Sequence, residues 1–124
     1  MNCPKCNAGM EKVTHEDIEV DRCTNCVGIW FDRLEREHLT QLAGSESIDV
    51  GNVVIARGFE TIDHIDCPVC RTPMIRMVDA EQPHIWYEAC TVCNGVFLDA
   101  GEFKDLKERT IVDRLRDLLT PTRR

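Results

Sequence analysis

Eight cysteines stand in this 124-residue chain as four Cys-x-x-Cys pairs. Two residues between cysteines let both sulfurs of a pair point at one centre, and a second pair completes a tetrahedron of thiolates, the coordination that structural zinc prefers. The pairs fall into two sets, with sixteen residues between the pairs of the first set and nineteen in the second. The sequence therefore predicts two zinc ions, with iron as an adventitious substitute, held by Cys3, Cys6, Cys23 and Cys26 and by Cys67, Cys70, Cys90 and Cys93.

Cysteine pairs and zinc also support catalysis, so two enzymatic alternatives need weighing. Redox-active pairs normally stand singly at a helix start in a βαβ context, which this sequence does not offer. A hydrolytic zinc needs an open coordination position, whereas four thiolates close the shell and the four histidines show no ligand spacing. We therefore expect no catalytic residue and no enzyme, and a thiol–disulfide redox protein is the less favoured alternative.

Length and composition indicate that folding depends on metal. The cysteine pattern divides the chain into two modules of roughly 35 to 40 residues, near the size below which a hydrophobic core alone fails to hold a fold. Only seven residues are aromatic. The first cysteine follows Met1 almost at once and no stretch of eighteen apolar residues occurs. We therefore expect no signal peptide, no membrane span and a cytoplasmic location.

The two halves repeat each other, at an offset of 64 residues before the hairpin and 67 after it. Between the cysteine pairs, Ile18 and Val20 recur at period two, and Ile85 and Tyr87 match them, which predicts a β-hairpin in each half. Asp32-x-x-Glu35 and Asp99-x-x-Glu102 both fit a capping box at the start of a helix. Gly28 and Gly95 follow the last cysteine of each half. We expect these glycines to let backbone N–H groups approach the sulfurs or to supply a positive φ.

The order C-P-x-C, then an acidic residue two positions before C-x-x-C-x-G-x-(W/F)-(F/L)-D-x-x-E, occurs twice. It resembles the transcription factor IIB-type zinc ribbon family of small prokaryotic zinc-finger proteins. The two copies cover residues 3–39 and 67–103, about three fifths of the chain. The resemblance implies zinc-ribbon folds with four cysteine ligands for each zinc, and it carries a transcription-related name.

The predicted fold is a small metal-stabilised α+β protein with two tandem zinc ribbons, each a β-hairpin with two Cys-x-x-Cys knuckles. A helix follows each ribbon, the first over 33–43 and a longer C-terminal one from Ala100 toward Leu119. The predicted domains are ribbon 1 with its helix (1–44), a linker with a candidate short strand at 53–56 (45–66), ribbon 2 (67–102), and a C-terminal amphipathic helix with a basic tail (103–124).

Charge and exposed apolar residues bear on the partner. The net charge is −7, yet residues 103–124 carry seven basic and four acidic groups. A phosphate backbone is repelled by most of such a chain, so nucleic-acid binding through ribbon 2 and the C-terminal helix is the alternative to a protein partner. Trp86 occupies the position of Glu19 in the first hairpin, and is expected either to face outward as a binding residue or to lie beneath the linker or the long helix.

The C-terminal helix carries two apolar faces. Phe103 and Leu106 are expected to cover ribbon 2, while a face rotated from them carries the remaining partner-binding candidates, Ile111, Leu115 and Leu118. This second face would contact the first module or linker, a second copy of the protein in a homo-oligomer, or a foreign partner, and the sequence leaves the three open. Taken together, the sequence predicts a non-enzymatic zinc-binding module that presents rigid ribbon surfaces to a protein partner, as an accessory protein of transcription.

Overall fold

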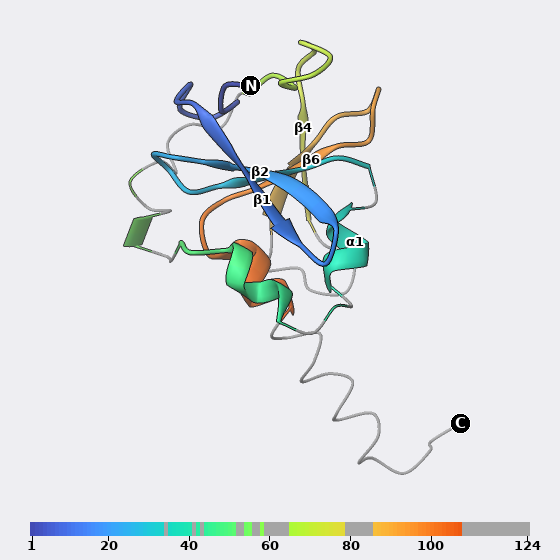
Figure 1. Ribbon diagram of the computed structural model, residues 1–124. Helices are drawn as coiled ribbons and strands as arrows, with labels where there is room; N and C mark the ends of the chain where they lie inside the picture. The colour runs from blue at the N-terminus through green and yellow to red at the C-terminus, as the bar shows by residue number, and fades with distance from the viewer. Residues whose placement is uncertain are drawn as a thin grey trace, which may run out of the picture.

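A computed structural model describes residues 1–33, 35–40, 42, 44–51, 54–55, 58, 65–78 and 86–107. Six strands form one sheet in the order β1-β2-β3-β6-β5-β4 (Figure 1). Their bounds are β1 Met10–His15, β2 Ile18–Cys23, β3 Ile29–Phe31, β4 Ile75–Val78, β5 Trp86–Ala89 and β6 Val96–Leu98. The helical elements in the described residues are α1 (Glu35–Thr40), the 3₁₀ helix η1 (Ser45–Ile48), residues 54–55 and residues 102–107.

The two predicted hairpins are confirmed. β1 pairs with β2 in antiparallel register up to His15↔Ile18, and β4 pairs with β5 up to Val78↔Trp86. The first hairpin closes through Glu16 and Asp17, whose φ angles are 47° and 68°. Positive φ at both central residues gives a two-residue turn whose twist matches that of the strands it joins.

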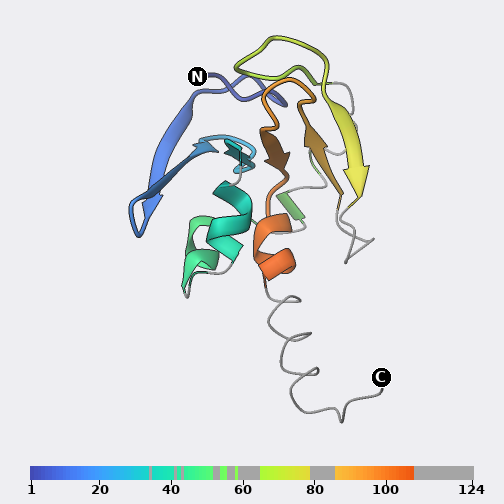
Figure 2. The same cartoon turned by 90° about the vertical axis from the view of Figure 1, so that its right-hand side faces the viewer.

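The two ribbons are joined into a single sheet, an arrangement that the sequence does not predict. β3 pairs antiparallel with β6 in the register Ile29↔Leu98, Trp30↔Phe97 and Phe31↔Val96. Trp30 and Phe97 are equivalent positions of the repeat, 67 residues apart, and they lie directly opposite each other. The halves are therefore related by an approximate two-fold axis that passes between these residues, and Figure 2 shows the sheet continuing across the junction.

The sheet has a core on each face. Alternation along β3 sends Ile29 and Phe31 to one face, where they are buried with Leu39 of α1 and Phe103 of the helical residues 102–107. The rings of Phe31 and Phe103 lie 5.2 Å apart between centroids. Figure 2 shows the helical segments gathered on this one side of the sheet. Trp30 faces the opposite side, among the cysteines.

Residues of the predicted linker bind the second helix. Asp49 is 3% exposed, and its carboxylate accepts the backbone N–H groups of Gly101 at 2.9 Å and Lys104 at 3.0 Å. It thus caps the helical residues 102–107, a role that the sequence analysis assigned to Asp99. Val54 and Ile55 are helical, so the candidate strand at 53–56 was wrong at these positions. The Gly58 N–H donates to the Ile55 carbonyl at 3.1 Å, which closes a turn where a strand would remain extended.

The capping box at Asp32 is half formed. The Glu35 carboxylate accepts the Asp32 N–H at 2.7 Å as predicted, but the Asp32 carboxylate accepts the indole N–H of Trp30 at 3.0 Å. α1 begins at Glu35, two residues after the predicted start. The predicted continuation of the second helix to Leu119, with Ile111, Leu115 and Leu118, lies outside the described residues. Within the described part of the chain, no helix is both long enough and apolar enough to cross a bilayer.

Candidate metal centres

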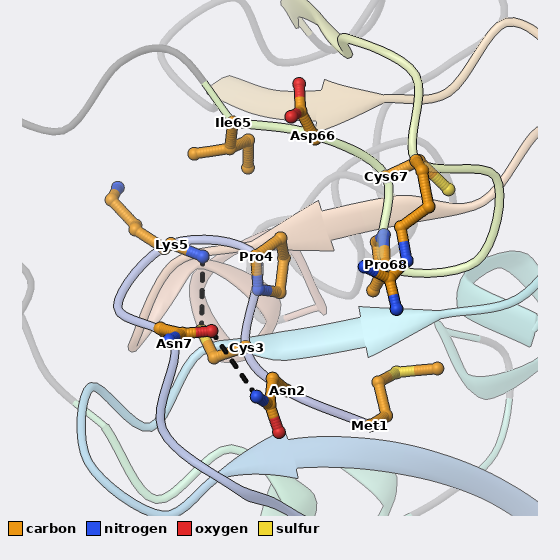
Figure 3. A pocket seen from close by; sticks show the side chains of 11 residues that line it. Met1, Asn2, Cys3, Pro4, Lys5, Asn7, Ile65, Asp66, Cys67 and Pro68 are labelled. Atoms are coloured by element: carbon orange, nitrogen blue, oxygen red, sulfur yellow. Dashed lines mark hydrogen bonds between the residues drawn. The ribbon is translucent and has the colours of Figure 1, made fainter.

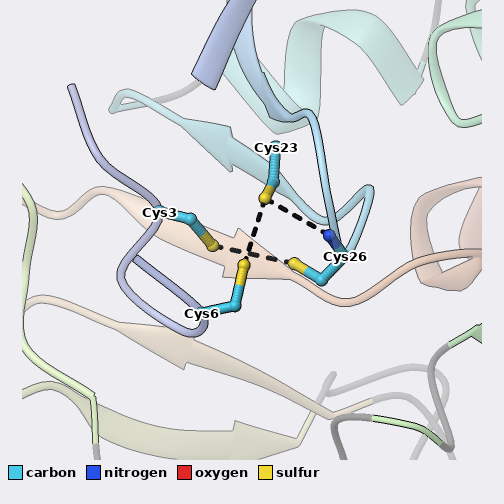
Figure 4. A group of neighbouring side chains, drawn as sticks. All are labelled: Cys3, Cys6, Cys23 and Cys26. Carbon is cyan, nitrogen blue, oxygen red and sulfur yellow. Dashed lines mark hydrogen bonds between the residues drawn. The ribbon is translucent and has the colours of Figure 1, made fainter. Parts of the chain in front are cut away.

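The first cysteine set converges on one point. Cys3 and Cys6 lie in the turn before β1, Cys23 ends β2, and Cys26 lies in the loop that leads to β3. Their sulfurs all lie within 4.8 Å of one another, with Cys3 and Cys26 at 3.7 Å and Cys6 and Cys23 at 3.3 Å (Figure 4). A tetrahedron with metal–sulfur bonds of about 2.3 Å has edges of about 3.8 Å. The four sulfurs therefore fit a four-thiolate zinc site.

The second set repeats this arrangement in the other half. The sulfurs of Cys67, Cys70, Cys90 and Cys93 also lie within 4.8 Å of one another, and those of Cys67 and Cys93 are 3.7 Å apart. Cys67 and Cys90 are buried, while Cys70 and Cys93 are half-buried. All eight thiols are free of disulfides. The structure thus places the eight cysteines in the two groups that their spacing predicts, and the two groups can hold two metal ions.

Backbone amides point at the sulfurs. The Lys5 N–H lies 3.3 Å from Cys3 Sγ, and the Cys70 N–H lies 3.2 Å from Cys67 Sγ. The Gly28 and Gly95 N–H groups bond to the sulfurs of Cys26 and Cys93, as expected for these glycines. Such donors stabilise a site with four negative thiolates. Positive φ falls elsewhere, at the residue after the last cysteine of every pair: Asn7 (66°), Val27 (60°), Arg71 (63°) and Asn94 (65°).

The four thiols of each centre hold protons unequally. The hydrogen bond between the Cys3 and Cys26 sulfurs lowers the pKa of Cys3 to about 5 and raises the pKa of Cys26. Burial raises the pKa of Cys93 to about 12. Metal binding must displace the protons that the cluster retains, so the affinity of these centres for zinc increases with pH.

Val27 offers a test of the knuckle geometry. A β-branched residue at positive φ is strained, whereas asparagine tolerates this region, and Asn94 occupies the equivalent position of ribbon 2. Val27→Asn should therefore stabilise the zinc-loaded protein by about 1 kcal/mol, measured by urea unfolding. The reverse exchange, Asn94→Val, should destabilise it by a similar amount, and equal stabilities for all three proteins would contradict the assignment.

The two centres share one core. The buried cysteines of both sets, Trp30 and Phe97 form one continuous apolar cluster. A Cβ added at Gly28 would lie 2.3 Å from Cζ of Phe97, and a Cβ added at Gly95 would lie 2.3 Å from Cζ2 of Trp30. Each ribbon therefore leaves space beside its last cysteine for the aromatic ring of the other. Because each ring is seated in the opposite ribbon, the packing of one centre depends on the fold of the other.

A partly buried ion pair also crosses between the ribbons. Lys5 Nζ, from the first knuckle, lies 2.6 Å from Asp99 Oδ1, beyond β6, and the Lys5 side chain is 1% exposed. Asp32, the equivalent of Asp99, binds the Trp30 indole instead. Phe97 replaces tryptophan in ribbon 2 and has no N–H to donate. The Asp99 carboxylate therefore accepts a hydrogen bond from Lys5 instead. No local sequence pattern predicts this contact.

Glu102 makes the stability of the fold depend on pH. Burial, together with the nearby carboxylates of Asp99 and Asp105, raises the pKa of Glu102 from 4.5 to about 7. A raised carboxyl pKa means that this group favours folding below about pH 4.5 and loses that contribution as pH rises through about 7. Glu102→Gln should therefore stabilise the zinc-saturated protein at pH 8 by about 1–2 kcal/mol after solvent screening, and much less at pH 5.5. Thermal unfolding of both proteins checks this, and an equal difference at both pH values would contradict it.

A groove lies between the first knuckles of the two ribbons (Figure 3). Its volume is 560 Å³. The lining pairs equivalent positions of the repeat, with Cys3 and Pro4 on one side and Cys67 and Pro68 on the other. Asn2 Nδ2 donates to Asn7 Oδ1 at 3.4 Å on the first side. The groove thus follows from the two-fold arrangement of the knuckles.

A hairpin whose two cysteine pairs converge on one tetrahedral site, extended by a third strand, defines a zinc ribbon, and this chain contains two. Residues 2–42 and 66–109 match the family described as transcription factor zinc-finger, of the transcription factor IIB zinc-ribbon type. These segments cover more than half of the chain, which therefore belongs to that family. No curated protein and no solved structure matches the chain.

The remaining site candidates divide between the described and undescribed residues. Trp86 stands on β5 with 48% of its surface exposed, so it faces outward rather than lying beneath another described segment. Phe103 and Leu106 are buried against the sheet, as expected for the first apolar face of the second helix. Three structural contacts were not predicted from the sequence: the Asp49 cap, the Lys5–Asp99 ion pair and the glycine–aromatic contacts.

Proposed function

We propose that the chain is a non-enzymatic interaction module in which two zinc ions hold one sheet rigid and present its surfaces to a protein partner. The observation that carries this proposal is the closure of both centres. Each has four thiolate donors at tetrahedral spacing, so a zinc bound there has no open position for a substrate. Zinc in such a site supplies folding free energy, and the chain's own residues provide the surface.

The role of this surface is recognition of a protein in the transcription machinery. The family description supports transcription as the setting. A protein partner is favoured over nucleic acid because the described surface has an excess of exposed apolar side chains on ribbon 2, namely Val69, Ile75, Met77, Trp86 and Val92. Exposed aromatic and large apolar residues are enriched at the centres of protein interfaces.

Affinity capture from the source cell tests the proposal. The zinc-loaded chain should retain a defined protein partner when the salt concentration is raised from 50 to about 300 mM, because an apolar interface is little screened. Trp86→Ala should reduce the capture while leaving the unfolding temperature nearly unchanged, since Trp86 is half exposed. Retention of nucleic acid alone, with affinity falling steeply with salt, would instead support the nucleic-acid alternative.

A further inference from the structure

β4 stands at one end of the sheet, and within the described part of the chain no strand pairs with the outer edge of Ile75–Val78. Backbone N–H and C=O groups at such an edge form a template for another strand. β1 stands at the opposite end and is the equivalent strand of ribbon 1. The repeat thus provides an internal comparison between two edges that share one fold.

The edge at β1 carries the features that discourage strand addition. The Glu11 carboxylate accepts a hydrogen bond from Arg22 at 2.8 Å, and Lys12 Nζ lies 2.8 Å from Asp21 Oδ1. Because neighbouring residues of a strand point to opposite faces, charged side chains lie on both faces of β1. Charged side chains on an edge strand disfavour pairing with another chain. Arg22 also donates to the Ile48 carbonyl at 2.8 Å, which fastens η1 against this hairpin. The β1 edge therefore carries charges of both signs, and η1 is held against the hairpin to which this edge belongs.

The edge at β4 differs at the equivalent positions. Ile75 takes the place of Glu11, and Met77 takes the place of Val13. Ile75 pairs with Ala89 and Met77 with Tyr87 across the ladder, so all four side chains lie on one face of the sheet. Ile75 is 47% and Met77 40% exposed. Ala89 replaces Arg22, so this hairpin lacks the side chain that holds η1 on ribbon 1. An apolar row therefore runs along one face of the open edge.

The other face of this edge carries one partly exposed guanidinium. Arg76 lies over the Trp86 ring at 5.9 Å and contacts the buried Glu88, yet its side chain remains 40% exposed. Arg71, four residues before the strand, is also exposed, but it lines the groove between the first knuckles. β4 and β5 carry no exposed carboxylate. A strand added here would find apolar contacts on one face and the exposed part of the Arg76 guanidinium on the other.

We propose that the β4 edge binds an extended segment of the partner protein as a seventh strand, with side chains that alternate between large apolar and acidic residues. The apolar ones would cover Ile75 and Met77, and the acidic ones would lie beside Arg76. This inference deepens the proposed function and rests on its protein partner. A second copy of the chain fits less well, because a four-residue edge buries too little surface for a stable dimer.

The test is a titration of the whole 124-residue zinc-loaded chain with synthetic peptides, followed by ¹H–¹⁵N NMR. The probe is a capped seven-residue peptide of alternating glutamate and valine. One control peptide alternates lysine and valine, and another places proline at the centre of the acidic peptide, where it removes a backbone donor. We expect shifts confined to β4, β5 and the Trp86 indole, with a dissociation constant on the order of 1 mM or tighter.

Substitutions on each face of the β4 edge test the contributions of the two faces to peptide binding separately. Ile75→Ser combined with Met77→Ser should weaken binding about tenfold, whereas Thr14→Ser on β1 should leave it unchanged. Arg76→Gln should abolish the preference for the acidic peptide over the basic one. Absence of binding at 10 mM peptide, equal binding of the proline peptide, or shifts centred on β1 would overturn the inference. If the chain captures a partner from cell extract but binds no peptide in this titration, the proposed function stands and only the strand-addition site is contradicted.

Discussion

Replacement of Cys23 by serine is expected to unfold both halves of the protein. Cys23 is fully buried and belongs to the first centre. Structural zinc contributes about 10–16 kcal/mol in small zinc-finger peptides, which is comparable to or larger than the net stability of about 5–15 kcal/mol of a typical domain. The second centre cannot compensate, because β6 pairs with β3 and Phe97 is packed against Gly28 of the first ribbon.

The two tryptophans report on the two halves separately. Trp30 is fully buried at the junction, and Trp86 stands on the second hairpin. In Cys23→Ser, the NMR signals of both indoles should collapse to the positions of an unfolded chain, and zinc content should fall well below two ions. Thr24→Ser, an exposed neighbour that keeps its hydroxyl, is the matched control and should bind two ions. A variant with a native Trp86 environment and one bound zinc would show that the ribbons fold independently.

Gly28→Ala is expected to cost about 2–3 kcal/mol of stability, near the upper end for overpacking a core. The added methyl group would lie 2.3 Å from the Phe97 ring, so either the ring or the β3–β6 junction must shift. Gly95→Ala should have a similar effect, because its methyl group would meet the Trp30 ring at the same distance. Gly9→Ala is the control, since no atom lies within 4 Å of its added Cβ. Chemical denaturation of the zinc-saturated proteins measures all three.

A second substitution tests the cause of this loss. Phe97→Leu removes the ring atom that the new methyl group contacts, so it should recover part of the stability of Gly28→Ala. The double variant should then be more stable than the sum of the single effects predicts, by about 1 kcal/mol or more. Strict additivity would mean that Gly28 matters for another reason, such as its N–H bond to Cys26.

The cysteine groups and the hairpins could be predicted because they depend on local spacing. Two residues between cysteines fix the shape of a knuckle, and alternating apolar residues such as Ile18 and Val20 fix a strand face. Asp32-x-x-Glu35 likewise identified the start of a helix to within two residues. Each of these patterns involves residues only a few positions apart, so the local backbone geometry alone determines which side chains come into contact.

The union of the ribbons could not be predicted in the same way. Trp30 and Phe97 are 67 residues apart, and a three-residue strand such as β3 has no periodicity that indicates its neighbour. The same holds for the Asp49 cap, which replaces a local carboxylate with one from 52 residues earlier. One signal was present: each half places a glycine two residues before its aromatic, and this small residue makes room for the ring of the other half.

The most direct test of this account is a stepwise removal of zinc, monitored by native mass spectrometry and by far-ultraviolet circular dichroism of the same samples. We predict that folded protein carries two zinc ions, that chelation converts it to unfolded metal-free protein, and that folded protein with one zinc stays a minor species throughout. A chain that keeps its strand signal after losing both ions would contradict the claim that zinc holds this sheet together.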